Sequence, residues 1–230
     1  LVWFHACSVG EVRSISKLIN GFLSRRYSIL ITSNTLLSAK YVKENFPDKV
    51  KHLFLPIDFK FATKKFLSHW KPSIGIFIES EIWPNLIRGC NKNKIPLVLA
   101  QARFSKNTLK KWYLFKKFFR ALLESFDLII AQSSATKKEL YKYANIKVNT
   151  IYNLKNSSPQ LNIKRNEVNK INKNINDKFI ITALSTHEGE ERILLKALKE
   201  ISKKIKHTVL ILQPRHPHRA NKIIKQIQKY

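Results

Sequence analysis

The stretch "FHACSVGEVRSI" at residues 4–15 carries an apolar strand directly into a helix. Phe4 to Cys7 has the character of a strand end, and Ser8 opens a segment with apolar residues at helical spacing. These apolar residues are Val12, Ile15, Leu18, Ile19 and Phe22. A strand that runs at once into a helix is typical of α/β proteins, whose ligands bind where strands end and helices begin.

Glu11 has two interpretations within this stretch. Ser8 and Glu11 are three residues apart, which is the spacing of a capping box. In that motif the serine caps a backbone N–H and the glutamate reaches back to the N–H of the serine. Local pattern alone favours this structural role. The alternative is catalytic, because a carboxylate beside the ligand crevice can take a proton from a substrate hydroxyl.

The same alternation of apolar and amphipathic runs continues along the chain. Continuous apolar strands separated by helices predict a parallel sheet that is covered on both faces. The expected strands are 1–6, 29–33, 50–55, 74–78, 97–100 and 128–131, with 148–155 closing the unit. Helical patterns include 35–46, 82–93, 106–125 and 134–144.

A change of composition divides the chain. Residues 156–178 are polar, rich in asparagine and free of aromatic residues, so we interpret them as a connection. Strand and helix patterns restart at residue 179 and run to the end of the sequence. We therefore expect one whole α/β domain at 1–155 and the first part of a second domain at 179–230.

The charge balance is strongly basic, with 43 lysine and arginine side chains against 15 acidic ones, a net charge of +28. This predicts a polyanionic partner: nucleic acid, an anionic membrane face or a phosphorylated substrate. A general drift of composition toward lysine and asparagine is the simpler explanation, since the basic residues are spread over the chain. Charge alone leaves these alternatives open.

Several classes of site are unsupported by the sequence. It contains no GxGxxG and no GxxxxGK[ST] motif, which leaves helix N-termini as the backbone device for holding phosphate. Its two cysteines, Cys7 and Cys90, lie far apart without metal-ligand spacing, so no metal site is expected. No apolar run approaches the roughly 20 residues of a membrane span. The absence of methionine, with Leu1 inside an apolar run, indicates an internal piece of a longer protein.

Polar residues follow three further strands. "IFIESEIWPNL" places Glu79 and Glu81 after a strand, where acidic residues are also ordinary partners of a helix dipole. "ALSTHEGEERILL" places His187 at the start of a helix, and "LQPRHPHR" places Arg215 after another strand. A guanidinium suits phosphate or carboxylate. Each signal has a structural explanation, and their order along one chain is the more informative feature.

Taken in order, "HACSVGE", "ESEIWPNL", "LAQARFS", "NLK", "STHEGEE" and "PRHPHR" resemble the Kdo transferases of lipopolysaccharide synthesis. The resemblance runs from Phe4 to about Arg219. It implies a glycosyltransferase B fold of two Rossmann-like domains, the second incomplete in this chain. It also implies an inverting transfer of 3-deoxy-D-manno-octulosonic acid (Kdo) from CMP-Kdo to the lipid A precursor, without a cofactor or a metal.

The resemblance assigns roles to five residues. The glutamate of "SVGE", the catalytic base in that family, corresponds to Glu11. Glu79 and Lys155 correspond to residues that support the transition state, and Pro214 and Arg215 to the pair that contacts CMP. The family further implies the cytoplasmic face of the inner membrane as the location, with an anchor upstream of Leu1 and an anionic lipid surface as partner.

Two alternatives remain open from the sequence. In the first, the chain is an inactive fragment of such an enzyme instead of part of an active one; in the second, it is a basic nucleic-acid-binding module. The second explains the charge, but no RNP, KH or zinc-finger pattern is present, so no specific nucleic acid is expected as a partner.

Overall fold

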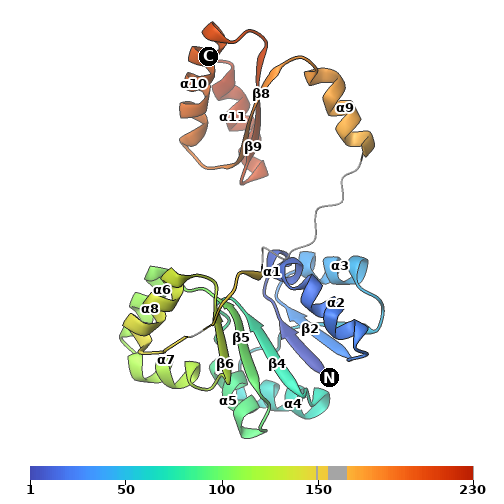
Figure 1. Cartoon of the computed structure of the whole chain (residues 1–230), viewed down its shortest axis with the longest axis vertical. Coiled ribbons are helices and arrows are strands. Elements are labelled where there is room, and N and C mark those ends of the chain that lie inside the picture. Colours follow the sequence, from blue (N-terminus) through green and yellow to red (C-terminus); the bar gives the residue numbers. More distant parts are fainter. Residues whose placement is uncertain (149, 155–164, 230) are drawn as a thin grey trace. The chain divides into compact units, whose positions relative to one another are not determined.

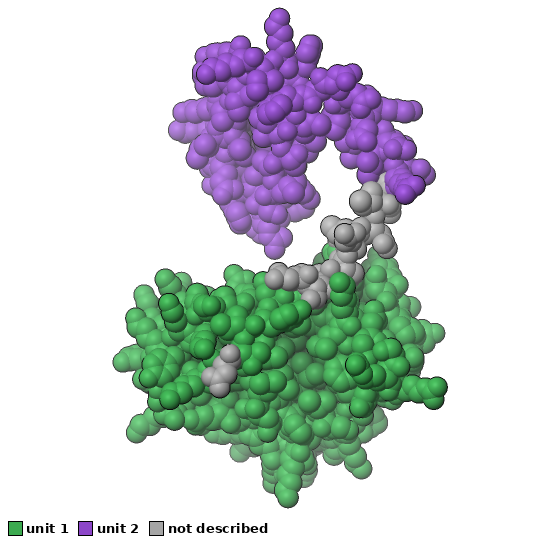
Figure 2. All heavy atoms as spheres, viewed as in Figure 1, with its two compact units in different colours: residues 1–160 green, residues 161–230 purple. Residues whose placement is uncertain are grey.

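The computed structural model describes residues 1–148, 150–154 and 165–229. The chain divides into two compact units, Leu1–Gln160 (unit 1) and Leu161–Tyr230 (unit 2). Figure 1 traces the elements and Figure 2 colours unit 1 green and unit 2 purple. Each unit is described by itself. Lys155 lies outside the described residues.

Unit 1 is built on a seven-stranded sheet in the order β3-β2-β1-β4-β5-β6-β7. Every strand pair is parallel, which confirms the α/β fold predicted from the alternating pattern. The strands are β1 (Val2–His5), β2 (Ile29–Ser33), β3 (Val50–Phe54), β4 (Ile74–Ile78), β5 (Leu97–Ala102), β6 (Leu128–Ala131) and β7 (Thr150–Ile151). The strand order runs outward in one direction from β1 to β3 and in the other from β4 to β7. A ligand crevice is therefore expected at the carboxyl ends of β1 and β4, where the order switches.

Helices cover both faces of this sheet (Figure 1). They are α1 (Val9–Ser14), α2 (Ser16–Ser24), α3 (Leu36–Asn45), α4 (Lys60–Trp70), α5 (Pro84–Lys92), α6 (Lys106–Tyr113), α7 (Lys116–Leu123) and α8 (Ser134–Ala144). Alternate residues of β1 face opposite layers: Trp3 packs with α4 and α5, and Phe4 packs with α2 and α3. Both faces are therefore buried, as continuous apolar strands require.

The first helix of the chain is broken where the sequence pattern predicts one continuous helix. The break falls at Ile15, whose backbone (φ −100°, ψ 1°) separates α1 from α2. On either side, the hydroxyl of Ser14 donates to the carbonyl of Glu11 at 2.7 Å, and that of Ser16 donates to the carbonyl of Val12 at 3.1 Å. Serine hydroxyls that bond backbone carbonyls bend helices, which accounts for the break.

The helical pattern at 106–125 also forms two helices, α6 and α7. The ring of Trp112 stacks on that of Phe119, with centroids 4.9 Å apart and planes 16° apart. Residues seven apart in a straight helix lie about 10.5 Å apart along its axis. The turn between the two helices is what allows this stacking.

Unit 2 contains β8 (Phe179–Thr186) and β9 (Thr208–Pro214), which pair in parallel. Its helices are α9 (Arg165–Ile175), α10 (Glu190–Lys204) and α11 (Ala220–Ile227), with a 3-10 turn, η2, at Pro217–Arg219. Apolar side chains of β8 stay exposed, with Leu184 at 65%. Across both units, the described part of the chain contains no helix with the length and apolar character needed to cross a membrane.

Candidate active site

The candidate site of unit 1 lies at the carboxyl ends of β1, β4 and β5. Glu11 follows β1 in the first helix, Glu79 follows β4 directly, and Glu81 comes two residues later. β1 and β4 are hydrogen-bonded neighbours, with His5 in register with Phe77. The topology thus brings together carboxylates that are about 70 residues apart in the sequence, at the switch point where α/β sheets bind ligands.

Glu11 is held at the start of α1 by a variant of the capping box. Ser8 is the N-cap, and its hydroxyl oxygen accepts from the backbone N–H of Glu11 at 3.4 Å. The hydroxyl also donates to Oε1 of Glu11 at 2.8 Å, and the N–H of Cys7 donates to Oε2 at 2.8 Å. The carboxylate of Glu11 therefore accepts from the N–H of Cys7. The prediction that it bonds the N–H of Ser8 is wrong. Both carboxylate oxygens are positioned at the strand end.

The surroundings make Glu11 a stronger proton acceptor. Burial raises the pKa of Glu11 above its ordinary value, the bonds from Ser8 and Cys7 oppose that shift, and the charges of Glu79 and Glu81 add to it. A general base works best when its pKa approaches the operating pH. Burial, with the charges of Glu81 and Glu11, also raises the pKa of the Cys7 thiol, so this cysteine stays a neutral thiol beside Glu11.

Glu79 occupies a strained backbone conformation next to a second strained residue. Its φ is 64°, and that of Gln101 in β5 is 56°, both in the left-handed region. The N–H of Glu79 donates to the carbonyl of Ala100 at 3.0 Å, and Nε2 of Gln101 donates to Oε1 of Glu79 at 3.3 Å. Gln101 is fully buried, and its Oε1 has no hydrogen-bond partner within the described ranges. Strain of this kind gathers at functional sites.

Glu81 belongs to a buried network to which the sequence assigns no role. Its Oε2 lies 3.0 Å from Nε2 of His5 and accepts from Nε1 of Trp83 at 2.9 Å. Nδ1 of His5 lies 3.0 Å from Oγ1 of Thr32, which accepts from Nε1 of Trp3 at 2.9 Å. The fully buried His5 thus links two strands to the loop after β4. A histidine closing the otherwise apolar strand "VWFH" is the sequence signal that points to it.

This network keeps Glu81 ionised. Burial opposes the charged form, but the hydrogen bond and charge of His5, with the bond from Trp83, outweigh it and lower the pKa of Glu81. An ionised carboxylate only accepts hydrogen bonds, so Nε2 of His5 carries the proton that it donates. Glu81 and Glu11 therefore have pKa values shifted in opposite directions, so the two neighbouring carboxylates differ in how readily they accept a proton.

In unit 2, Pro214 ends β9 and Arg215 follows it with an exposed side chain. The N–H of Arg215 donates to the carbonyl of Thr186 at the end of β8, at 3.0 Å. Behind this edge, Oγ1 of Thr186 donates to Oε1 of the buried Glu191 at 2.9 Å, and Nη2 of Arg219 donates to its Oε2 at 3.0 Å. The sequence patterns did not single out the Glu191–Arg219 pair, whose bonds hold the end of β8 in place.

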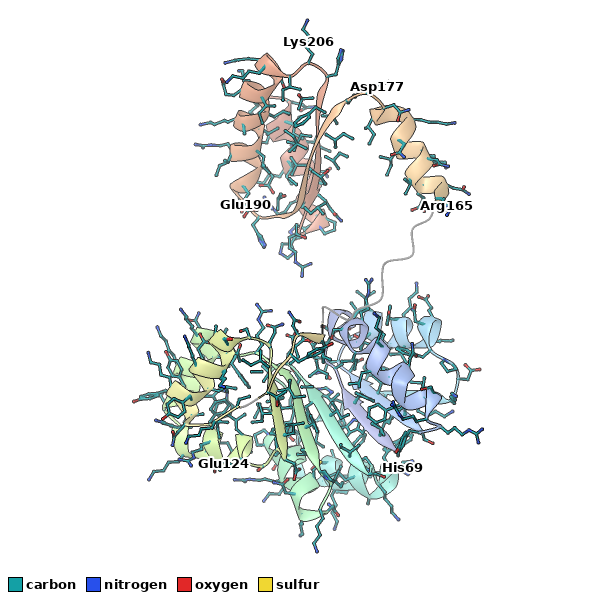
Figure 3. The ribbon with its side chains drawn as sticks, viewed as in Figure 1. His69, Glu124, Arg165, Asp177, Glu190 and Lys206 are labelled. Carbon is teal, nitrogen blue, oxygen red and sulfur yellow. The ribbon has the colours of Figure 1, made fainter. Side chains whose placement is uncertain are left out.

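"STHEGEE" forms the turn into α10. Ser185 has a φ of 58° and Gly189 a φ of 94°, so the turn uses two left-handed residues. The N–H of His187 donates to Oε2 of Glu190, labelled in Figure 3, at 2.7 Å. The exposed ring of His187 lies 6.3 Å from that of His216, which follows Arg215. Neither unit, over its described residues, groups three or more histidine, cysteine or acidic side chains so that they could hold a metal ion.

Comparison with known proteins identifies the chain. Residues 1–158 match the family model of 3-deoxy-D-manno-octulosonic-acid transferase (kdotransferase). The chain belongs to the Kdo transferase family. It is 36% identical over 229 residues to the 3-deoxy-D-manno-octulosonic acid transferase of Rickettsia typhi, an alignment that covers 97% of this chain and 49% of that protein. The family resemblance inferred from the motifs is thus confirmed, and the chain spans about half the length of the curated relatives that it matches.

Solved structures agree on the fold. A glycosyltransferase from Rickettsia africae superimposes with a TM-score of 0.68 at 13% identity, covering 99% of this chain and 64% of that one. UDP-GlcNAc 2-epimerase from Neisseria meningitidis, solved with UDP-GlcNAc, gives a TM-score of 0.69 at 15% identity, covering 99% and 68%. At such identities the likeness concerns the fold alone, and it confirms the predicted glycosyltransferase B architecture.

Proposed function

We propose that the protein containing this chain is an inverting glycosyltransferase that moves Kdo from CMP-Kdo to the lipid A precursor in lipopolysaccharide synthesis. Membership of the Kdo transferase family supports the reaction class. The observation that carries the proposal is the placement of Glu11, with a raised pKa, at the switch point beside Glu79 and Glu81. This is a base at the edge where an α/β protein binds its substrates.

In the proposed reaction Glu11 accepts the proton of the acceptor's primary hydroxyl. The hydroxyl oxygen forms a bond to the anomeric carbon of Kdo while the bond from that carbon to the phosphate oxygen breaks. The electron pair leaves with CMP on the opposite face, so the configuration inverts. The bonds from Ser8 and Cys7 fix the carboxylate in place for this transfer. General-base assistance of this kind contributes about 10²–10⁴ in rate.

Charge that develops in the transition state is assigned to other groups. We assign Glu79 and Lys155 to its support, the lysine on family resemblance alone. Glu79 is suited to a fixed position because its strained backbone and the amide of Gln101 both hold it. Pro214 and Arg215 are assigned to CMP, with the exposed guanidinium meeting the phosphate as the leaving group takes up charge.

The domain assignment follows from these roles. We propose that residues 1–155 bind the acceptor, that 156–178 connect the domains, and that 179–230 begin the part that binds CMP-Kdo. The structure assigns α9, within 156–178, to unit 2. The net charge of +28 suits a phosphorylated lipid acceptor at the anionic cytoplasmic face of the inner membrane, where we place the enzyme.

The test is product formation by the whole protein. Supplied with CMP-Kdo and the lipid A precursor, the protein should release CMP and add the mass of Kdo to the lipid, as measured by mass spectrometry. Replacing CMP-Kdo by a UDP-sugar should abolish the product. Lipid that stays unmodified while the folded protein binds nucleic acid with steep salt dependence would support the nucleic-acid-binding alternative instead.

A further inference from the structure

A groove in unit 1 lies between α4 and α5, and its lining includes none of the three carboxylates of the candidate active site. Its volume is about 460 Å³, which is enough for a phosphate-bearing headgroup or a small polyanion. α4 runs from Lys60 to Trp70, and the label of His69 in Figure 3 marks its carboxyl end. Nothing in the proposed transferase reaction uses this groove.

The groove has an apolar floor between two close helices. A Cβ placed on Gly89 of α5 would lie 2.8 Å from Cδ1 of Leu67 in α4, so the glycine lets the helices approach here. Lys60 and Lys64 stand one turn apart on α4, and Arg88 and Lys92 do so on α5. Side chains at this spacing share a helix face, and all four line the groove.

The groove is lined by cations without any carboxylate. With 43 basic and 15 acidic side chains, the chain has too few carboxylates to pair every lysine. An unpaired lysine is therefore not by itself a sign of a binding site. What distinguishes the groove is that four cations line one concavity that has no acidic side chain among its lining residues. The cavity between α10 and α11 is lined by five basic side chains, but Glu188 and Glu191 line it as well and pair with Lys222 and Arg219. A concave surface of one sign focuses the field and concentrates counter-ions.

The backbone of α5 does not supply this site. The N–H groups of Asn85 and Leu86 already donate to the carboxylate of Asp58, at 3.1 and 2.9 Å. The start of the helix is therefore capped from within the protein. Binding would depend on the four side chains, of which Arg88 is also held by the ring of Phe118, 5.1 Å from its guanidinium carbon.

We propose that the α4–α5 groove binds a phosphate group, carried either by a lipid headgroup or by a soluble diphosphate. Several converging cations suit a multiply charged anion, and a guanidinium adds paired donors to phosphate oxygens. Phe59 and Phe61 flank Lys60 and are 68% and 80% exposed. Exposed aromatic side chains beside phosphate-binding cations favour the lipid as the source.

The test compares two double variants of equal charge. Lys64→Gln with Lys92→Gln removes one cation from each wall of the groove. Lys196→Gln with Lys199→Gln removes two exposed cations of α10 and is the matched control. Each is titrated with inorganic pyrophosphate by calorimetry, and with vesicles of phosphatidylcholine alone or containing phosphatidic acid by co-sedimentation. Melting curves verify that both variants remain folded.

The groove variant should lose at least about fivefold in affinity for pyrophosphate, for phosphatidic acid vesicles or for both, while the control loses less than about twofold. A loss for vesicles alone identifies the lipid headgroup as the source, and a loss for both includes soluble diphosphate. Equal losses in the two variants, no loss in either, or no binding of any probe by the unchanged chain would overturn the proposal. Transferase activity enters none of these readouts.

Discussion

The two units present polar groups at the carboxyl ends of parallel strands, but on supports of different construction. β1 of unit 1 is buried along its whole length, and the carboxylates that follow β1 and β4 are fixed by hydrogen bonds from several elements. β8 of unit 2 is largely exposed, and Arg215 and His187 beyond the strand ends face solvent. Burial gives the proposed base a defined pKa and position, whereas the exposed guanidinium of Arg215 is accessible to the phosphate that we propose it meets.

The largest expected effect comes from replacing Glu11, the proposed general base in unit 1. Glu11→Gln in the whole protein should lower turnover at least about a hundredfold, the low end for a missing general base, because an amide cannot accept the proton. Glutamine has nearly the same size and keeps one acceptor oxygen for the bonds at the strand end, so the cost in unfolding free energy should stay within about 1 kcal/mol. The loss of turnover is measured at saturating CMP-Kdo and lipid A precursor. A variant with near-normal turnover would leave Glu11 as a helix cap.

The corresponding substitution in unit 2 should have a smaller effect on the reaction. Arg215→Ala removes the charge-assisted contact that we propose to the donor, and should raise the KM for CMP-Kdo roughly tenfold, equivalent to about 1.4 kcal/mol. Lys206→Ala is the control, because Lys206 lies in the turn before β9, at the opposite end of the strand (Figure 3). Steady-state kinetics on both variants give the comparison. Equal KM values would remove Arg215 from the donor site.

A third substitution compares how much the buried network and an exposed ion pair contribute to the unfolding free energy. Glu81→Gln should cost about 1–3 kcal/mol of unfolding free energy at pH 7, since it leaves the buried His5 without its carboxylate. Glu124→Gln, which breaks an exposed pair with Arg120, should cost no more than about 0.5 kcal/mol. Urea denaturation measures both. Similar costs would mean that the network contributes no more than a surface pair.

The same variant carries a pH signature. Because the pKa of Glu81 is lowered by folding, its stabilisation is fully present above its ordinary value of 4.5 and is lost as pH falls through the folded value. The unchanged protein should therefore lose more stability on acidification than Glu81→Gln does.

The smallest expected effect concerns the cap itself. Ser8→Ala removes the hydroxyl that accepts from the N–H of Glu11, and should cost about 1 kcal/mol, or about 2–4 °C in melting temperature. Turnover should stay within several-fold of the unchanged protein, because Cys7 still holds Oε2 of the glutamate. A large loss of turnover with little change in melting temperature would assign Ser8 to the reaction rather than to the helix.

The sequence predicted the sheet well because its strands carry a local signal. The ranges 29–33, 74–78 and 128–131 match β2, β4 and β6 residue for residue, since these apolar runs are bounded by polar residues. The break at Ile15 was not predictable from periodicity, because serine bonds to the backbone, not the apolar pattern, produce it.

The candidate site was only partly predictable. Motif resemblance selected Glu11 and Glu79, but the bond between His5 and Glu81 joins residues 76 apart in the sequence. That contact depends on β1 lying beside β4, which the strand order decides and no local pattern encodes. The left-handed backbone of Glu79 and Gln101 was equally hidden, because neither residue type is a usual signal of that conformation.

The most direct test of the central claim, that the carboxylate with the raised pKa is the base of the reaction, is the pH dependence of kcat/KM. This quantity reports the ionisation of the free enzyme's essential groups. We predict an acid limb with a midpoint above 4.5, the ordinary value for a glutamate, that moves to lower pH in Glu81→Gln because one of the charges raising the pKa of Glu11 is gone. The residual activity of Glu11→Gln should lack this limb. A limb that persists in Glu11→Gln would contradict the assignment of Glu11 as the base.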